Sequence, residues 1–318
     1  MNNNALTVVM YHYVRDLKNS RYPQIKGLDT DIFLSQVDYL QCNYKIVRME
    51  DVLAACYDKV PLPEKAVLLT FDDGYADHFN TVFPILKNRG LQGSFFAPVR
   101  AVTEHTVLDV NKIHFILASI SSTEPLLAEI RHLLEKYAKD YSLCTYEKYY
   151  AKLAVANRFD PPEVIFVKRL LQVELPVEVR QKITDELFDK IVGIDQGAFS
   201  RELYMSLEQM KLMVANGMHI GSHGFDHFWL SSLSREQQET EIKKSADFIV
   251  SIGGCPDTKT ICYPYGNYNR DTLELLTKYG FKAGFTTQVA IADLSRNQAY
   301  ELPRIDTNDI TKNMQDGE

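Results

Sequence analysis

The stretch LLTFDDGY, residues 68–75, carries an apolar run into two adjacent aspartates, a glycine and a tyrosine. The run is short and follows Pro61 and Pro63, so it predicts a buried strand rather than a helix. Enzymes of the α/β class place reacting groups where buried parallel strands end. Asp72 and Asp73 repel each other, so keeping both ionised in a cleft requires a cation, usually a metal. Taken alone, the stretch also fits a strand followed by a solvated turn.

A second stretch, HIGSHGFDH at residues 219–227, adds histidines to this pattern. His223 and His227 are four residues apart, so one helical turn would let their imidazoles converge on one ion. Together with Asp73 they would form a two-histidine, one-carboxylate set that leaves a position for water, as catalytic metal sites do. Asp226, between the histidines, would either accept a hydrogen bond from one of them or be exposed.

Three motifs in order give the chain a resemblance to the polysaccharide deacetylases of the NodB-homology type, carbohydrate esterase family 4. TFDDGY at 70–75 resembles the first motif, and SHGFDH at 222–227 resembles the second, with Gly224 where Ser or Thr is usual. YPYG at 263–266 resembles the third motif in the form found in one branch of the family. The resemblance implies a distorted, TIM-like α/β barrel that is expected to have seven strands.

The alternation of strand-like and helix-like runs is typical of an α/β barrel or a doubly wound sheet, and an insertion interrupts it. These runs alternate through residues 1–99 and 205–318, which we assign to the deacetylase barrel. Residues 100–204 break the alternation, and apolar residues recur there at helical spacing, so they predict a helical insertion. Because it follows a strand predicted at 93–99, we expect the insertion at the active-site end of the barrel, where it would shape substrate choice or an oligomer interface.

The resemblance also implies roles for the motif residues. Asp73, His223 and His227 would hold a divalent metal, with zinc as the default and cobalt, nickel or iron also compatible with these ligands. Asp72 would act as the general base that takes a proton from water. The backbone N–H of Tyr265 would bind the oxyanion, although the residues around it would also suit a plain turn at a strand end.

Two departures from the family pattern leave roles unfilled. Cys262 stands where the third motif often has an arginine that pairs with the base, and Arg304, in the last predicted strand at 300–305, is our candidate replacement. The alternative for Arg304 is a surface position. No histidine follows His227, so the usual late acid is missing. We predict that His12 replaces it as general acid, since histidine titrates near neutrality; the alternative is a histidine packed at a strand end.

Composition restricts the partners and the compartment. The chain has 318 residues, of which 45% are hydrophobic, and a net charge of −7, which argues against nucleic-acid binding. The five cysteines form no CxxC pair and predict free thiols in a reducing compartment. No signal peptide and no stretch as long as a transmembrane helix is apparent, so we expect a cytoplasmic protein.

The sequence therefore predicts a metal-dependent hydrolase that removes the N-acetyl group of an amino sugar in a polysaccharide or a glycoconjugate precursor. Its partner would be an N-acylated carbohydrate, and the insertion would be the region available for homo-oligomer contacts. Two alternatives stay open: a deformylase or deacetylase of a nucleotide- or lipid-linked small sugar, and a catalytically inactive carbohydrate-binding barrel. The intact metal set and the neighbouring Asp72 count against an inactive barrel.

Overall fold

A computed structural model describes residues 4–295 and 298–315. The chain divides into two compact units. The first contains Met1–Asp16, Gly27–Thr106 and Ser200–Glu318, and the second contains Leu17–Lys26 and Val107–Phe199.

The second unit differs from the predicted insertion, 100–204, in two respects that the sequence did not indicate. Its main segment is shorter, Val107–Phe199, because residues 100–106 and 200–204 belong to the first unit. Besides residues inside that range, it contains the short segment Leu17–Lys26. Tyr22 of this segment packs its ring against Phe115 and Phe199, with ring centroids 4.8 and 6.0 Å away. Aromatic contacts therefore attach a distant piece of chain to the helical unit.

The first unit is built around one curled and mostly parallel sheet. Its strands are β1 (Ala5–Tyr11), β4 (Lys45–Ile46), β5 (Ala66–Asp72), β6 (Ser94–Ala97), β7 (His219–Ser222), β8 (Thr260–Cys262), β9 (Ala283–Phe285), β10 (Ala292–Asp293) and β11 (Ile305–Asp306). Strands β1, β5, β6, β7, β8 and β9 pair in parallel in that order. The short β2 (Val14–Arg15) and β3 (Leu28–Asp29) pair separately.

The last part of the chain closes this sheet into a barrel. Phe285 of β9 bridges Leu302 in parallel, and three residues later β11 pairs in parallel with β1. Among the described residues, the ring therefore runs through seven strands, β1, β5, β6, β7, β8, β9 and β11. The predicted α/β barrel with seven strands is confirmed. In such barrels the carboxyl ends of the strands form the rim that carries active sites.

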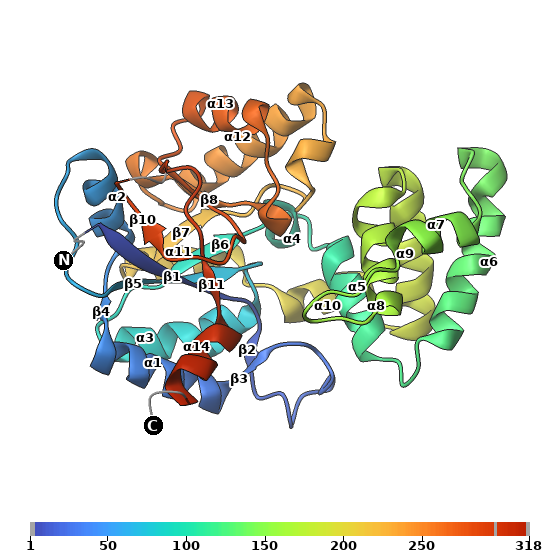
Figure 1. Cartoon of the computed structure of the whole chain (residues 1–318), viewed down its shortest axis with the longest axis horizontal. Coiled ribbons are helices and arrows are strands. Elements are labelled where there is room, and N and C mark those ends of the chain that lie inside the picture. The colour runs from blue at the N-terminus through green and yellow to red at the C-terminus, as the bar shows by residue number, and fades with distance from the viewer. Residues whose placement is uncertain (1–3, 296–297, 316–318) are drawn as a thin grey trace. The chain divides into compact units, whose positions relative to one another are not determined.

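Helices cover the barrel from outside, with α1 and α3 on one side of the sheet and α12 and α13 on the opposite side (Figure 1). The helices of the first unit are α1 (Thr30–Asn43), α2 (Met49–Tyr57), α3 (Phe83–Asn88), α4 (Val99–Thr103), α11 (Leu207–Ala215), α12 (Arg235–Ser251), α13 (Arg270–Lys278) and α14 (Thr307–Gln315). A capping box begins α12, because Ser234 accepts the N–H of Gln237 and the Gln237 side chain accepts the N–H of Ser234.

Close packing beneath the rim fixes the strand ends. Every residue of β5 is buried, and Phe71 stacks on Tyr11 of β1 and Phe95 of β6, with ring centroids 4.9 and 4.8 Å apart. Each such ring contributes roughly 1.5–3 kcal/mol by burial, so this aromatic row holds three neighbouring strands in register. Asp72 directly follows Phe71, so the packed strand fixes the position of its backbone.

Two predicted strands are shorter than expected. The strand predicted at 93–99 ends at Ala97, because Pro98 precedes α4 and its fixed φ favours a helix start there. The run 300–305 pairs with β9 from Leu302 onward, and β11 itself begins only at Ile305.

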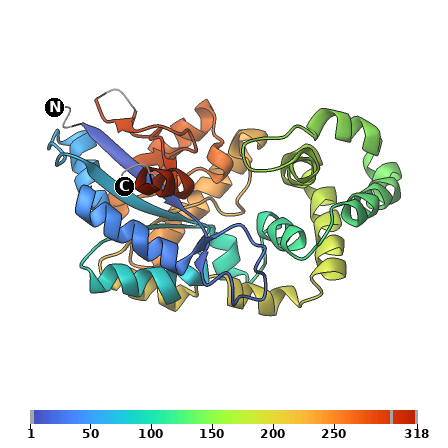
Figure 2. The same cartoon turned by 60° about the horizontal axis from the view of Figure 1, so that its bottom comes forward.

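The second unit consists of helices and connecting loops, shown from green to yellow in Figure 2. It contains α5 (Asp109–Ala118), α6 (Glu124–Tyr141), α7 (Tyr146–Leu153), α8 (Pro162–Arg169), α9 (Val177–Ile191) and the first part of α10 (Gln196–Leu203). The buried side of α6 is formed by the apolar residues that the sequence placed at helical spacing, including Leu126, Ile130, Leu133 and Leu134. Throughout the described part of the chain, no helix combines the length and the apolar character that crossing a membrane requires.

Candidate active site

Asp73, His223 and His227 bring three possible ligand atoms together at the rim of the barrel. Asp73 follows β5 and His223 follows β7, so both leave carboxyl ends of strands. Asp73 Oδ1 lies 3.4 Å from His223 Nε2 and 3.3 Å from His227 Nε2, and the two Nε2 atoms are 3.1 Å apart. All three side chains are buried.

These spacings fit a metal ion. A tetrahedral ion about 2.0–2.1 Å from each ligand holds the ligand atoms about 3.3–3.4 Å apart. Asp73 Oδ1 is buried and accepts no hydrogen bond from any residue that the structure describes. Such a buried oxygen is costly unless it has a partner, and a cation between the three atoms would provide one. The chemistry of the donor set therefore suits a divalent metal.

The histidines converge through a loop, and the helical turn that we predicted between them is wrong. Residues 223–227 are not helical. Gly224 has a φ of 76° and His227 a φ of 58°, so two left-handed residues reverse the chain direction instead. His223 Nδ1 donates to the carbonyl of Cys262 at 2.7 Å, which leaves its Nε2 lone pair for a metal.

The neighbouring aspartates act on the same group because the backbone turns between them. In an extended strand, adjacent side chains point to opposite faces. Asp73 has a φ of 74°, which breaks this alternation. Gly74 follows with a φ of 65°, and a Cβ on it would lie 2.8 Å from Ala97 Cβ, so only glycine fits there. As a result, both carboxylates interact with His223 and raise its pKa against the lowering effect of burial.

Tyr75 determines which oxygen of Asp73 remains for a ligand. Its hydroxyl donates to Asp73 Oδ2 at 2.6 Å, and its ring stacks on Tyr13 with centroids 3.9 Å apart. Burial raises the pKa of Asp73, but the two histidines outweigh this effect and hold the pKa well below its usual range. Asp73 is therefore ionised, with Oδ1 directed at the histidines.

Arg304 lies against Asp72 inside the barrel. The Arg304 Nη1 group donates to Asp72 Oδ1 at 2.9 Å, and Nη2 is 2.8 Å from Oδ2. Both side chains are at most 2% exposed. Arg304 also donates to the Thr286 carbonyl at 2.9 Å and to Cys262 Sγ at 3.1 Å. The guanidinium thus occupies the space beside Cys262, and the surface alternative for Arg304 is excluded.

This ion pair keeps Asp72 charged. Burial raises the pKa of Asp72, but the Arg304 guanidinium and His223 outweigh burial, so the pKa falls to about 2. Positive charge on His12 acts in the same direction on both Asp72 and Asp73. His12 is half-buried directly after β1, and its carbonyl accepts a hydrogen bond from His78 Nε2 at 2.9 Å. The structure therefore brings His12 into the electrostatic surroundings of the two aspartates.

Tyr265 borders the site from the third motif. Its backbone is left-handed, with φ 58° and ψ 12°, and its ring lies edge-on to His227 with centroids 4.7 Å apart. Trp229 stacks on the Tyr265 ring, with centroids 5.0 Å apart. Left-handed backbone at non-glycine residues costs energy, and three of the seven such residues in the described part of the chain, Asp73, His227 and Tyr265, lie at this site.

Sequence reasoning missed Trp229 and Glu241. Trp229 is the single tryptophan of the chain and follows His227 by two residues, so its position offered a signal. Glu241 offered none, because it lies in α12 and meets the site only through the fold. Its buried Oε2 accepts the backbone N–H groups of Phe225 and Asp226, both at 2.9 Å.

Glu241 and α4 hold the loop between the histidines from two sides. The N–H groups of Val99 and Arg100, at the start of α4, donate to the carbonyls of Gly224 and Phe225 at 3.2 and 3.0 Å. Arg100 also donates to Asp226 Oδ1 at 2.7 Å, so the Asp226 carboxylate binds an arginine rather than orienting a histidine. Gly224 has a left-handed φ of 76°, and a Cβ there would also lie 3.3 Å from Glu241 Oε2, so the backbone and the contact both favour glycine.

Comparisons with known proteins show which family this chain resembles. The family model described as polysaccharide deacetylase matches residues 59–135 and 193–284, more than half of the chain. YxkH of Bacillus subtilis (strain 168), whose name assigns it to the polysaccharide deacetylases, is 23% identical over 94% of this chain and 70% of its own length.

Two further relatives extend the likeness. The poly-β-1,6-N-acetyl-D-glucosamine N-deacetylase of Escherichia coli (strain K12) is 36% identical over 26% of this chain and 12% of its own length. The Streptococcus pyogenes deacetylase PplD, solved with acetate, superposes with a TM-score of 0.59 at 19% identity over 98% of both chains. The chain therefore belongs to the polysaccharide deacetylase family and is a hydrolase of carbon–nitrogen bonds in carbohydrates.

Proposed function

We propose that the protein removes N-acetyl groups from the amino sugars of a polysaccharide, using a divalent metal held by Asp73, His223 and His227. The observation that carries this proposal is the placement of three mutually close ligand atoms beside the buried pair of Asp72 and Arg304. A bound metal supplies a Lewis acid that lowers the pKa of water and polarises the acyl oxygen. Zinc suits the near-tetrahedral spacing best, while cobalt, nickel and iron share the ligand preference.

The residues around the ligands supply the proton transfers and the stabilisation of the oxyanion. Asp72 is ionised at neutral pH and takes the proton of the attacking water, while Arg304 fixes the direction of its carboxylate. His12, on the neighbouring strand end, gives a proton to the departing amine. The N–H of Tyr265 donates to the oxyanion, and the ring contacts with His227 and Trp229 hold this part of the backbone in place.

The similarity to the Escherichia coli enzyme supports a substrate that contains N-acetylglucosamine. A nucleotide- or lipid-linked sugar and an inactive carbohydrate-binding barrel are the competing assignments. The cytoplasmic location, and a part for the second unit in substrate choice or oligomer contacts, stay predictions.

Acetate release under metal control tests the proposal. The protein is stripped with a chelator, reloaded with zinc, cobalt, nickel or iron(II), and incubated with chitin oligomers, β-1,6-linked N-acetylglucosamine oligomers and a nucleotide-linked N-acetyl sugar. We expect acetate from an oligomer only after reloading. Release from the nucleotide-linked sugar alone would favour the first competitor, and oligomer binding without any acetate would favour the second.

A further inference from the structure

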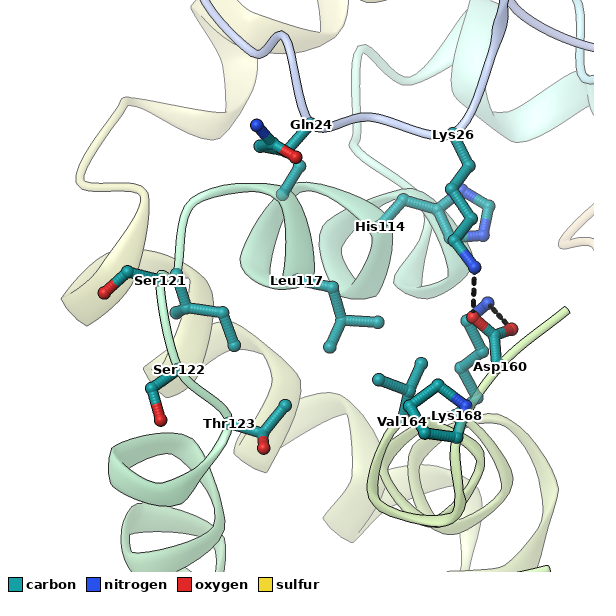
Figure 3. A pocket seen from close by; sticks show the side chains of 13 residues that line it. Gln24, Lys26, His114, Leu117, Ser121, Ser122, Thr123, Asp160, Val164 and Lys168 are labelled. Carbon is teal, nitrogen blue, oxygen red and sulfur yellow. Dashed lines mark hydrogen bonds and ion pairs between the residues drawn. The ribbon is translucent and has the colours of Figure 1, made fainter. Parts of the chain in front are cut away.

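The helical unit contains a cavity of its own, and its lining includes none of the residues of the candidate active site. The cavity has a volume of about 280 Å³. It is lined by Gln24, Lys26, His114, Leu117, Ala118, Ile120, Ser121, Ser122, Thr123, Asp160, Pro161, Val164 and Lys168, all within the second unit (Figure 3). This volume is close to the lower end of small-molecule sites, roughly 300–1,000 Å³, and suits a molecule the size of one sugar or a short acid.

One end of the cavity carries an excess of positive charge. Asp160 is buried, and its carboxylate accepts hydrogen bonds from Lys168 Nζ at 2.7 Å and from Lys26 Nζ. The Lys26 side chain is 66% exposed, so its ammonium can move without leaving water. Two ammonium groups around one carboxylate leave a net charge of about +1 at this end, which attracts an anion and repels a cation.

Hydrogen bonds within the loop before α8 fix the position of Asp160. Asn157 Oδ1 accepts the backbone N–H groups of Phe159 and Asp160, both at 2.8 Å. Lys26 Nζ donates to the carbonyl of Phe159 at 2.8 Å as well. Burial raises the pKa of Asp160, but Lys168 and Lys26 outweigh burial and lower it, so the carboxylate stays ionised. The loop therefore fixes the position of the Asp160 carboxylate, while the exposed Lys26 ammonium beside it can move.

The rest of the cavity changes from apolar to polar with distance from the lysines. Leu117 and Val164 form its half-buried middle, and Figure 3 shows Leu117 between the charged end and the hydroxyl groups of Ser121, Ser122 and Thr123. Apolar surface left partly open in a concave site favours an apolar part of a ligand. The hydroxyl groups at the far end can both donate and accept hydrogen bonds.

We propose that this cavity binds a small hydroxylated carboxylate. Its carboxylate would meet Lys26 and Lys168, its apolar part would cover Leu117 and Val164, and its hydroxyl would reach the serine and threonine end. A single negative charge balances the excess at the lysines, whereas inorganic phosphate brings more charge and no apolar part. Two classes of compound combine a carboxylate with hydroxyl groups in this way: aliphatic hydroxy acids and uronic acids.

Calorimetric titration of the full chain tests the proposal with four probes: ω-hydroxyhexanoate, glucuronate, hexanediol and inorganic phosphate. We expect saturable binding of at least one carboxylate, and binding of hexanediol and phosphate at least about 10-fold weaker. Binding of ω-hydroxyhexanoate alone assigns the aliphatic source, and binding of glucuronate alone assigns the sugar acid. Absence of binding by both carboxylates, or equal binding of hexanediol, overturns the proposal.

Variants locate the bound carboxylate. Lys168→Met should weaken its binding about 10-fold or more, and Leu117→Trp should abolish it by filling the cavity. Should Leu117→Trp fail to fold, the double variant Lys26→Met, Lys168→Met gives the same answer from partly exposed positions. Lys152→Ala, at an exposed ion pair in the same unit, is the matched control. Unchanged binding in the cavity variants contradicts the site.

Asp73→Asn should bind the carboxylate as tightly as the wild type does. This result would separate binding in the cavity from the proposed deacetylation.

Discussion

Asp72 in the barrel and Asp160 in the helical unit are both buried and both lie beside basic side chains, yet their partners differ. The Arg304 side chain beside Asp72 has no exposed surface, and its planar guanidinium meets both carboxylate oxygens. The lysines beside Asp160 are 66% and 21% exposed. A buried guanidinium fixes one carboxylate position, whereas a lysine ammonium is mobile and easily redirected. Asp72 therefore suits proton transfer, and Asp160 suits holding cations around a cavity.

Removing the buried cation should have the largest effect. Arg304→Met leaves Asp72 buried without its main partner, so we expect a loss of about 3–5 kcal/mol in the free energy of unfolding, measured by urea denaturation. In the wild type, the lowered pKa of Asp72 stabilises the fold above the usual carboxyl range, and this stabilisation is lost as the pH falls toward 2. Without Arg304, burial raises the pKa of Asp72, so the acid limb of the pH–rate profile should move to higher pH.

The matched variant in the helical unit is Lys168→Met, which leaves Lys26 beside Asp160. Its unfolding free energy should fall by clearly less than that of Arg304→Met. Equal losses in the two variants would contradict the distinction between the two aspartates.

The proton donor gives the next largest effect. His12→Ala should keep the metal and the fold but lower turnover by roughly 10²–10⁴-fold, the usual contribution of general acid catalysis. Metal content and initial rates of acetate release check this prediction. His132→Ala, at an exposed position on α6, is the control and should leave turnover unchanged. Near-normal turnover in His12→Ala would remove His12 from the mechanism.

Glu241 should have a smaller effect that falls on metal affinity. Glu241→Ala removes the acceptor for the N–H groups of Phe225 and Asp226, so the loop that carries His223 and His227 loosens. We expect metal binding to weaken about 10–100-fold in competition with a chelator. Glu241→Gln keeps one oxygen able to accept both hydrogen bonds and should restore most of the affinity. Equal affinities in the alanine variant and the wild type would show that the loop needs no such support.

The smallest effect belongs to exposed charges of the helical unit. Lys152 pairs with Glu174 at 2.6 Å, but its side chain is largely in water. Exposed ion pairs contribute little, because solvent screens them and ordering two long side chains costs entropy. Lys152→Ala should therefore leave the urea midpoint unchanged within error, and a clear shift would mean that exposure is a poor guide here.

The sequence predicted the barrel well, and it also predicted that Asp73, His223 and His227 lie together, because both depend on local patterns. The apolar run before Asp72 and the spacing of His223 and His227 are visible without the fold. The reason for the convergence of the histidines was wrong, since left-handed backbone at Gly224 and His227 replaces the expected helix. Left-handed backbone at single residues produces no periodic pattern in the sequence, so the sequence does not predict it.

Contacts between distant residues limited the prediction elsewhere. Arg304 and Asp72 are far apart in the chain, so the sequence named Arg304 as a candidate partner of Asp72 but left a surface position for it open. Glu241 reaches the histidine loop because α12 packs beside it, which no local pattern encodes. The charged end of the cavity joins Lys26 to Asp160 through the packing of Tyr22, and the sequence gives no sign of that contact.

We propose that Asp73 holds a metal while Asp72 moves a proton, and one paired measurement tests both roles. Zinc content and acetate release are determined side by side for the wild type, Asp73→Asn and Asp72→Asn, all reloaded with zinc. We predict that Asp73→Asn loses both metal and acetate release, whereas Asp72→Asn keeps the metal and loses acetate release. Metal retained in Asp73→Asn, or near-normal acetate release by Asp72→Asn, would contradict the account.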